Sequence, residues 1–265
     1  MTGRTRRRTL GQHFLRDFGV ARAIVDALDP RPTDLVVEIG PGEGALTAEL
    51  ARRAGRLVAL EIDRSLAAPL QAHLPGVDIV EADAQRWDYS TLERPPGGRV
   101  LVIGNLPYSV GTAILMTLVD ARGAIDEMVV MLQREVAERV AAAPGSRSYG
   151  SLSVLVQLGW DVHVILRVSP GAFRPPPKVE SAVLRLTVLP RPRVTIADEE
   201  HFRTVVRAAF AQRRKTLANA LAAGLALTAP RAREILAAVG IDPQRRAETL
   251  DLAEFARLTA QIGES

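Results

Sequence analysis

Three glycines stand directly after a short apolar run in this chain of 265 residues. The run is Leu35–Ile39, and the glycines are Gly40, Gly42 and Gly44. Glycine lets the backbone turn sharply and lets a ligand approach it closely. The spacing differs from the G-x-G-x-x-G of dinucleotide-binding folds, and the turn lacks the lysine of a phosphate-binding loop. Taken alone, the turn indicates a ligand site only weakly, because any tight strand-to-helix connection uses glycine.

Acidic residues follow the next two apolar runs and strengthen this interpretation. Glu61 ends the run Leu57–Glu61, where a carboxylate can accept hydrogen bonds from a ribose diol. Asp83 and Ala84 follow the run Val77–Glu81, and Asp83 could accept from the exocyclic amine of an adenine. Open α/β sheets bind ligands at the carboxyl ends of their strands. The three loops predict a cofactor that carries adenosine without a pyrophosphate, and S-adenosylmethionine fits better than NAD or ATP.

The most specific chemical motif is Asn105-Leu106-Pro107-Tyr108, which follows the run Val100–Gly104. The N6 lone pair of adenine is delocalised into the ring, so N6 is a poor nucleophile. The Asn105 side-chain carbonyl and the Leu106 backbone carbonyl can accept both N6 hydrogens, which aims a pyramidal nitrogen at a sulfonium methyl. Pro107 stiffens the turn and Tyr108 can stack on the base, so positioning replaces a strong general base. Alone the motif also fits an ordinary strand-ending turn; beside the glycines and acids it predicts amino-group methylation.

A second aromatic residue, Phe173, begins a proline-rich segment that also carries Arg174 and Lys178. A base must leave its stack to enter a pocket of this kind. Phe173 and Tyr108 are therefore predicted to sandwich one base, with Arg174 and Lys178 on neighbouring phosphates. The residue type of Phe173 fits an ordinary core aromatic equally well.

The elements that must position these residues alternate along the chain. The four apolar runs above and a fifth, Met128–Leu132, are separated by longer helical patterns, including one over 45–53. This alternation indicates βαβ units on a parallel sheet. Two later runs, Leu152–Leu158 and Ala182–Leu189, have no clear helix between them and are expected to form an antiparallel edge pair.

Two prolines, Pro190 and Pro192, mark a boundary, after which the pattern is helical throughout. We expect an α/β domain over 1–189 and a small helical domain over 190–265. Asp251 and Glu254 have the spacing of a capping box. Helices are expected over Glu199–Ala223, Pro230–Val239 and Leu252–Ile262.

Composition narrows the class of protein. Apolar residues make up 47% of the chain, which is enough for a core, and cysteine is absent. The absence of cysteine excludes disulfides, thiolate zinc sites and iron–sulfur clusters, and the four histidines lack metal-binding spacing, so no metal is expected. No secretory signal or membrane-spanning stretch is visible, and no zipper pattern occurs. We therefore expect a cytoplasmic monomer.

Basic residues gather near both ends of the chain, which has 34 lysines and arginines against 30 acidic residues. Such clusters fit a phosphate-rich partner or a solvated surface, and charge alone does not decide between them. The clusters are Arg4, Arg6, Arg7, Arg8 and Arg16, and Arg203, Arg207, Arg213, Arg214 and Lys215.

Together these motifs resemble the ribosomal RNA adenine N6,N6-dimethyltransferases, specifically the bacterial KsgA type that modifies small-subunit RNA. The resemblance covers nearly the whole chain. It is carried by Leu10–Leu15, Glu38–Gly42, Glu61–Asp63, Asn105–Tyr108, Gln133–Ala137, Pro144–Gly150, Phe173–Val179 and Phe210–Thr216.

The resemblance implies a Rossmann-like class I S-adenosylmethionine-dependent methyltransferase sheet and a small C-terminal helical domain that helps dock on the ribosomal particle. It implies dimethylation of two adjacent adenines in a hairpin loop near the 3′ end of 16S RNA, as part of small-subunit biogenesis. The implied cofactor contacts are His13, Leu15, Gly40, Glu61, Asp83 and Asn105, and Gly42 and Ala84 are expected beside them. In the docking domain, the expected RNA contacts are Arg207, Arg213, Arg214 and Lys215.

Two positions depart from the family pattern. Ser109-Val110-Gly111 stands where Asn-Ile-Ser is common, and His13 stands where asparagine is also common. Neither change removes a group that the mechanism needs, although the first could alter how the loop after Tyr108 is held.

Three alternatives stay open at this point. The Erm type, which methylates a 23S adenine, shares the fold and the glycine motif, but 133–150 and 212–216 look more like the KsgA type. DNA adenine methyltransferases favour proline directly after the Asn or Asp, where this chain has Leu106. A non-catalytic assembly factor could use the fold as a scaffold; the intact Asn105–Tyr108 motif argues against a purely structural duty but allows a dual role.

Overall fold

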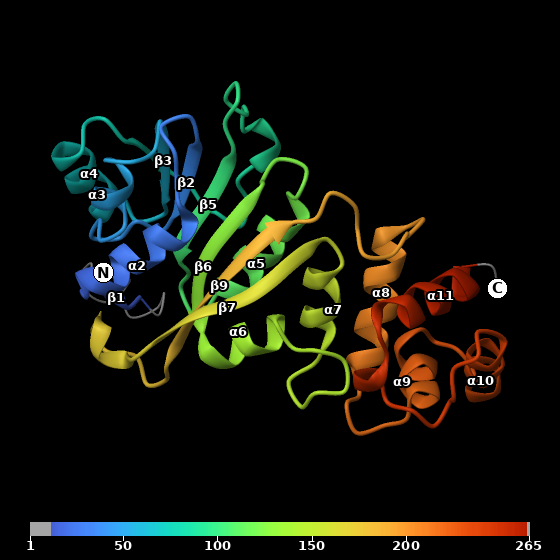
Figure 1. Ribbon diagram of the computed structural model, residues 1–265. Helices are drawn as coiled ribbons and strands as arrows, with labels where there is room; N and C mark the ends of the chain where they lie inside the picture. Colours follow the sequence, from blue (N-terminus) through green and yellow to red (C-terminus); the bar gives the residue numbers. More distant parts are fainter. Residues whose placement is uncertain (1–11, 264–265) are drawn as a thin grey trace. The chain divides into compact units, whose positions relative to one another are not determined.

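The computed structural model describes residues 12–263, which divide into two compact units (Figure 1). Of these residues, the first unit holds 12–137 and 161–188, and the second holds 138–160 and 189–263. Arg4, Arg6, Arg7 and Arg8 of the first basic cluster lie outside the described residues.

A seven-stranded sheet organises the first unit. Its order is β4-β3-β2-β5-β6-β9-β7, and β2 pairs in parallel with both β3 and β5. The pairs β3–β4 and β5–β6 are also parallel, whereas β9 runs antiparallel to β6. The strands are β2 (Leu35–Ile39), β3 (Arg56–Glu61), β4 (Asp78–Glu81), β5 (Val100–Asn105), β6 (Glu127–Gln133), β7 (Trp160–Val168) and β9 (Ser181–Val188). The five parallel strands expected from the apolar runs are thereby confirmed.

Helices follow the strands as a βαβ arrangement requires. Between β2 and β3 the helix is shorter than expected, α3 at Thr47–Leu50, with turns on either side. Helix α2 (Phe18–Leu28) packs on β5, β6 and β9, and its Ile24, Val25 and Leu28 are buried in the core. The other helices near the sheet are α4 (Arg64–His73), α5 (Gly111–Asp120), α6 (Arg134–Val140) and the 3₁₀ turn η1 (Tyr89–Thr91).

A small second sheet fixes the start of the described chain. β1 (Phe14–Leu15) pairs antiparallel with β8 (Phe173–Arg174), which follows the 3₁₀ turn η2 (Pro170–Ala172). The Arg16 N–H donates to the Ala172 carbonyl at 2.8 Å and continues this pairing. Residues 12–16 are therefore held against the large sheet by a segment about 160 residues away.

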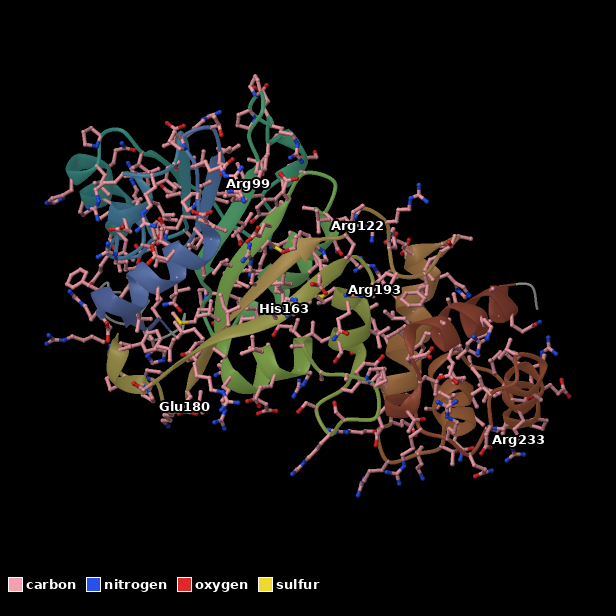
Figure 2. The ribbon with its side chains drawn as sticks, viewed as in Figure 1. Arg99, Arg122, His163, Glu180, Arg193 and Arg233 are labelled. Carbon is pink, nitrogen blue, oxygen red and sulfur yellow. The ribbon has the colours of Figure 1, made fainter. Side chains whose placement is uncertain are left out.

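At the opposite end of the sheet, where the parallel strands begin, an ion pair joins the residues that precede the two central strands. Arg99 (Figure 2) precedes β5 and contacts the buried Asp34, which precedes β2, with 2.7 Å between Nη2 and Oδ2. Asp34 also accepts from the Arg99 backbone N–H at 2.9 Å. This satisfied contact holds the two central strands in register and leaves their carboxyl ends for a ligand.

The segment Leu152–Leu158 corrects one prediction. It forms a helix, α7 (Ser151–Gln157), whereas the partner of β9 at the sheet edge is β7. An unbroken apolar run does not distinguish a buried helix from a buried strand. In the structure, the start of this helix is stabilised by Ser153, whose Oγ accepts a hydrogen bond from the N–H of the N-cap residue Gly150 at 3.0 Å.

The second unit contains 138–160 as well as the C-terminal helices, so its composition differs from the boundary expected near residue 190. The contacts of the segment explain this grouping. Helix α7 packs against α8 (Glu199–Phe210), and the Gly145 N–H donates to the Glu248 carbonyl at 2.7 Å. The segment is thus tied to residues that follow it by about 50 to 100 positions.

The long helix expected over Glu199–Ala223 is two helices, α8 and α9 (Leu217–Gly224), joined by a turn. The break lets α9 fold back on α8, where a Cβ at Gly224 would lie 2.6 Å from Ala208 Cβ. Small residues at the contact allow this close approach, which burial of Leu217 and Leu221 stabilises.

The remaining helices of the second unit agree with the sequence pattern. They are α10 (Ala229–Ala238), the 3₁₀ turn η3 (Ala247–Thr249) and α11 (Leu252–Gly263). The expected capping box is confirmed: the Asp251 N–H donates to Glu254 at 3.0 Å, and the Glu254 N–H donates to Asp251 at 2.8 Å. Across residues 12–263, no helix combines the length and the apolar character that crossing a membrane would need.

Candidate functional site

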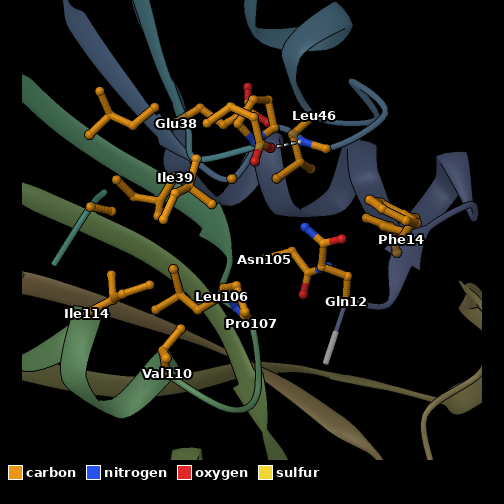
Figure 3. Close-up of a pocket in the computed structure, with 18 of the residues that line it drawn as sticks. Gln12, Phe14, Glu38, Ile39, Leu46, Asn105, Leu106, Pro107, Val110 and Ile114 are labelled. Carbon is orange, nitrogen blue, oxygen red and sulfur yellow. Dashed lines mark hydrogen bonds between the residues drawn. The ribbon is translucent and has the colours of Figure 1, made fainter. Parts of the chain in front are cut away.

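A pocket opens at the carboxyl ends of the parallel strands in the first unit (Figure 3). The loops after β2, β3, β4 and β5 form its floor and sides, and residues 12–15 form a further wall. Its cavity volume is about 130 Å³, and it is lined by apolar side chains with a small number of polar groups, as ligand sites in proteins are. The predicted site residues that line it are His13, Leu15, Gly40, Gly42, Glu61, Asp83, Ala84, Asn105, Leu106, Pro107 and Tyr108.

The glycine-rich turn has the backbone conformation that only glycine adopts readily. Gly40 has φ +65° and Gly42 has φ +58°, both in the left-handed region. A Cβ at Gly40 would meet no atom within 4 Å, so the space in front of it is open. At Gly42 a Cβ would lie 3.0 Å from the Phe14 ring, which packs on the turn from the N-terminal wall. The turn therefore offers bare backbone to a ligand on one side and supports Phe14 on the other.

Glu61 ends β3 with its side chain buried at the pocket floor. One carboxylate oxygen accepts from the Gly42 N–H at 3.1 Å, and the other accepts from the Asp63 N–H at 2.9 Å. Burial raises the pKa of this carboxyl, while the two backbone donors oppose the rise. Two backbone donors thus fix the carboxylate in place, and each of its oxygens keeps lone pairs for ligand hydroxyls.

Glu38 and Gln12 are pocket residues that the sequence analysis did not assign. Within the described chain, Glu38 Oε2 and Gln12 Oε1 are buried without a hydrogen-bond partner. Burial, with the nearby Glu61 charge adding to it, raises the pKa of Glu38 to about 8. A charged residue inside the apolar run Leu35–Ile39 was the signal for Glu38, since buried acids need a partner. Gln12 Oε1 is an acceptor, and Glu38 Oε2 is one when its carboxyl is ionised, so the pocket suits a ligand that brings donors or positive charge.

Asp83 and Ala84 form the third loop of the pocket, after β4. Asp83 Oδ1 accepts from the Gln85 N–H at 2.9 Å, which sets the side-chain direction. The Ala84 carbonyl accepts from the buried Tyr89 hydroxyl at 2.9 Å. Burial raises the pKa of Tyr89, so the phenol keeps its proton and the bond. These contacts hold the loop beside Glu61.

The motif Asn105-Leu106-Pro107-Tyr108 crosses the pocket after β5. Asn105 Nδ2 donates to the His13 carbonyl at 2.9 Å, and the Leu106 N–H donates to the Met131 carbonyl of β6 at 3.1 Å. Figure 3 shows Asn105, Leu106 and Pro107 around the pocket together with Glu38. The Tyr108 ring is half-buried in the wall and lies 5.2 Å from the His13 ring, centroid to centroid. The asparagine amide and the tyrosine ring are therefore both held by the N-terminal wall.

Phe173 does not join these residues, contrary to the predicted sandwich. Its side chain is 4% exposed and belongs to the hydrophobic core, and it is not among the pocket residues. The pairing of β8 with β1 explains this, since Phe173 lies opposite the buried Leu15. Phe173 is thus an ordinary core aromatic in this structure, which is the other role that its residue type allowed.

The expected RNA contacts fall outside the pocket. Arg174 is exposed at the end of β8 and Lys178 on the segment after it, where the Pro175 carbonyl contacts the His13 ring at 2.7 Å. Arg207 is exposed on α8, whereas Arg213, Arg214 and Lys215 are exposed on the turn after it rather than on one helix. Arg213 contacts the Arg147 carbonyl and has Nε 3.8 Å from Glu248 Oε2, so part of its charge is already compensated.

The sheet order, the glycine-rich turn after β2 and the pocket at the strand ends define a Rossmann-like class I methyltransferase. A family model described as ribosomal RNA adenine dimethylase matches residues 3–261. The chain therefore belongs to the ribosomal RNA adenine dimethylase family, whose members are enzymes that use S-adenosylmethionine as methyl donor.

Two bacterial relatives are similar over almost their whole length. A Geobacter metallireducens protein named ribosomal RNA small subunit methyltransferase A is 47% identical over 258 residues, which cover 96% of this chain and 94% of that one. A protein of the same name from Moorella thermoacetica is 46% identical over 266 residues, which cover 97% and 92%.

Two solved structures share the fold. A dimethyladenosine transferase from Plasmodium falciparum has a TM-score of 0.78 at 22% identity and covers 95% of this chain and 98% of that one. The 23S rRNA methyltransferase ErmE has a TM-score of 0.67 at 26% identity and covers 94% and 99%.

Proposed function

We propose that this enzyme uses S-adenosylmethionine to dimethylate the N6 amino groups of two adjacent adenines in the 3′-terminal hairpin loop of 16S ribosomal RNA. The observation that carries the proposal is the Asn105 side-chain amide, held at the pocket by its bond to the His13 carbonyl. Since the two bacterial relatives described above are named small-subunit methyltransferases, the small-subunit RNA is the favoured substrate.

The pocket fits the cofactor in charge and in shape. S-adenosylmethionine carries a sulfonium and an ammonium, and the pocket is lined by four acidic residues and the bare backbone at Gly40. Glu61, held by two backbone donors, is suited to accept from the ribose hydroxyls, and Asp83 to accept from the adenine amine. The buried, unpartnered oxygens of Glu38 and Gln12 suit the cationic part of the ligand. The four acidic residues are Glu38, Glu43, Glu61 and Asp83.

When bound, S-adenosylmethionine supplies an electrophilic methyl group and departs as a neutral thioether. Asn105 uses its Nδ2 to donate to the His13 carbonyl, so Oδ1 is the atom that accepts from N6. The Leu106 carbonyl accepts the second N6 hydrogen, and Pro107 limits the motion of this turn. These acceptors stabilise the pyramidal nitrogen that reacts, and the barrier falls through positioning and electrostatics. N6 becomes cationic as it takes the methyl group and then loses one of its hydrogens to water as a proton.

Tyr108 stacks on the target base from one side, and the base must leave the RNA stack to reach it. Arg174 and Lys178, on the exposed segment that follows the buried Phe173, contact phosphates beside the flipped nucleotide. Phe173 has no stacking role in the conformation described above.

The second unit docks on RNA of the small ribosomal subunit or its precursor. Its exposed basic side chains Arg207, Arg213, Arg214 and Lys215 support this role, because phosphate contacts dominate RNA affinity. We therefore assign ribosome docking to the helical domain expected over 190–265, together with the segment 138–160 that groups with it in the structure. Acting on bacterial ribosomal RNA, the enzyme works in the cytoplasm, and we propose that it does so as a monomer.

Transfer of labelled methyl groups to defined RNAs tests the proposal. The substrates are unmethylated small ribosomal subunits, a 16S 3′-terminal hairpin, a 23S fragment and double-stranded DNA. We expect two methyl groups on each of two adjacent adenines in the small subunit. Label on the 23S fragment would favour the Erm type, label on DNA would favour a DNA enzyme, and binding without transfer would indicate an assembly factor.

A further inference from the structure

The hydroxyl of Ser181 contacts the Tyr108 hydroxyl in the wall of the pocket. The two oxygens are 2.5 Å apart, and either can donate. Burial raises the pKa of Tyr108, so its phenol is neutral and keeps a proton for this bond. Ser181 itself is fully buried and is not a pocket residue, so it cannot touch a ligand there.

The position of Ser181 in the sheet makes it a rigid anchor. It is the first residue of β9 and lies opposite Gln133 of β6, while Asn105 of β5 lies opposite Met131 of the same strand. The Arg134 N–H donates to the Glu180 carbonyl at 2.9 Å, and their side chains form an ion pair at 2.5 Å. Ser181 therefore ties the loop after β5 to a strand two positions away in the sheet.

A second contact holds the same ring. The His13 ring lies against Tyr108 at a tilt of 40°, and His13 Nδ1 is 2.7 Å from the Pro175 carbonyl. Pro175 begins the segment between β8 and β9, and Ser181 follows that segment as the first residue of β9. The Tyr108 ring is thus held through its hydroxyl and by the His13 ring, which leaves it little freedom to rotate.

We infer that Ser181 is a positioning residue, which sets the angle of the Tyr108 ring so that the ring can receive the target adenine. The inference rests on the proposed function, in which Tyr108 stacks on that base. Ser181 acts only through the phenol, because its hydroxyl is occupied by Tyr108 and shielded from the pocket. Loss of its hydroxyl should therefore lower the rate of methyl transfer and spare cofactor binding.

A double-mutant cycle tests this assignment. Ser181→Ala, Tyr108→Phe and the double variant are compared as full-length proteins in single-turnover reactions on unmethylated small ribosomal subunits, with cofactor saturating. Each single variant should be about 3- to 10-fold slower, the value of one hydrogen bond, and the double variant no slower than the slower single. Ser181→Thr, which keeps the hydroxyl, should recover most of the rate, and calorimetry should give an unchanged cofactor affinity for Ser181→Ala.

Ser153→Ala is the matched control, because Ser153 is also a fully buried serine with both a donated and an accepted bond. It should lower the melting temperature and leave the rate unchanged. A wild-type rate for Ser181→Ala, or losses that multiply in the double variant, would overturn the inference. If Ser181→Thr fails to fold, the rates of Ser181→Ala, Tyr108→Phe and the double variant still test the inference. Tyr108→Ala separates the two proposals: if it transfers methyl groups normally, the stacking role of Tyr108 fails whatever Ser181 does.

Discussion

The side chain of Asn105 donates from Nδ2 to the backbone carbonyl of His13 at 2.9 Å, although 92 residues separate them in the chain. The bond orients the amide, because Nδ2 is the donor end and Oδ1 the acceptor end of the same group. It also joins the wall at 12–15 to the loop after β5. The residues proposed to bind the cofactor and to recognise the base are thereby connected through this bond.

Asn105→Ala should strongly slow methyl transfer while the fold and RNA binding persist. The Oδ1 acceptor acts on the reactive geometry of N6, so its loss should slow the chemical step by about 10²–10³, as for loss of one oxyanion-hole donor. Single-turnover rates at saturating cofactor measure this. Asn105→Asp keeps an acceptor but turns a carboxylate oxygen toward the His13 carbonyl. It should retain a part of the activity, and a rate equal to that of Asn105→Ala would argue against acceptance from N6.

Glu61→Ala should weaken S-adenosylmethionine binding by about 1.5–3 kcal/mol, the range of a hydrogen bond to a charged group. Calorimetry with and without RNA measures it. Glu81→Gln is the control: Glu81 lies beside Glu61 on β4, is exposed and is not a pocket residue. Because Glu61 also holds the Gly42 and Asp63 N–H groups, Glu61→Gln should weaken binding with less disturbance of the turn. An unchanged dissociation constant in both Glu61 variants would remove this residue from the cofactor site.

Cofactor affinity should rise with pH up to about pH 8 and level off above it. Glu38, with its pKa raised by burial to about 8, is mostly protonated at neutral pH in the free enzyme. A cationic ligand favours the ionised carboxylate, so binding releases a proton and affinity gains at most about tenfold per pH unit below pH 8. Calorimetry in buffers with different enthalpies of ionisation measures how many protons are released when the cofactor binds.

Glu38→Gln should bind more weakly, with a flat pH profile, and a profile that persists in this variant would assign the proton to another group. The single-turnover rate at saturating cofactor should stay level between about pH 7 and 9, since no titrating base takes part. A rate that rises tenfold per pH unit over that range would refute the mechanism.

Reversing charge on the turn after α8 should weaken binding to the small ribosomal subunit and leave cofactor affinity unchanged. Arg214→Glu with Lys215→Glu removes two exposed cations, so the salt dependence of binding should become shallower. Arg233→Glu is the control, because Arg233 is exposed on α10 (Figure 2) and lies outside the cluster. Arg213→Glu should have a mixed effect, since Arg213 also contacts Arg147 and Glu248. If affinity and salt slope both stay constant, the cluster is a solvated surface.

Sequence alone predicted the parallel strands and most of the pocket, for a physical reason. Glu61, Asp83 and Asn105 each stand at or just past the end of an apolar run, and parallel strands bring such ends to one edge. Among the pocket residues that it did not assign, Glu38 and Gln12 carry buried oxygens without a hydrogen-bond partner, which only the structure shows. For Glu38, the charge inside an apolar run was the sequence signal. The turn at 211–216 was missed because the helical pattern continues through it, while the reason for the break lies in the packing of α9 on α8.

What the sequence determined by itself is therefore the set of groups at the strand ends and the chemistry that they can perform, because period and composition act locally. Tertiary structure decided which distant segments meet them. It placed Phe173 in the core through the pairing of β8 with β1, grouped 138–160 with the C-terminal helices, and brought His13 and Ser181 to Tyr108. Such contacts join residues that are tens to more than 150 positions apart, and no local pattern encodes them.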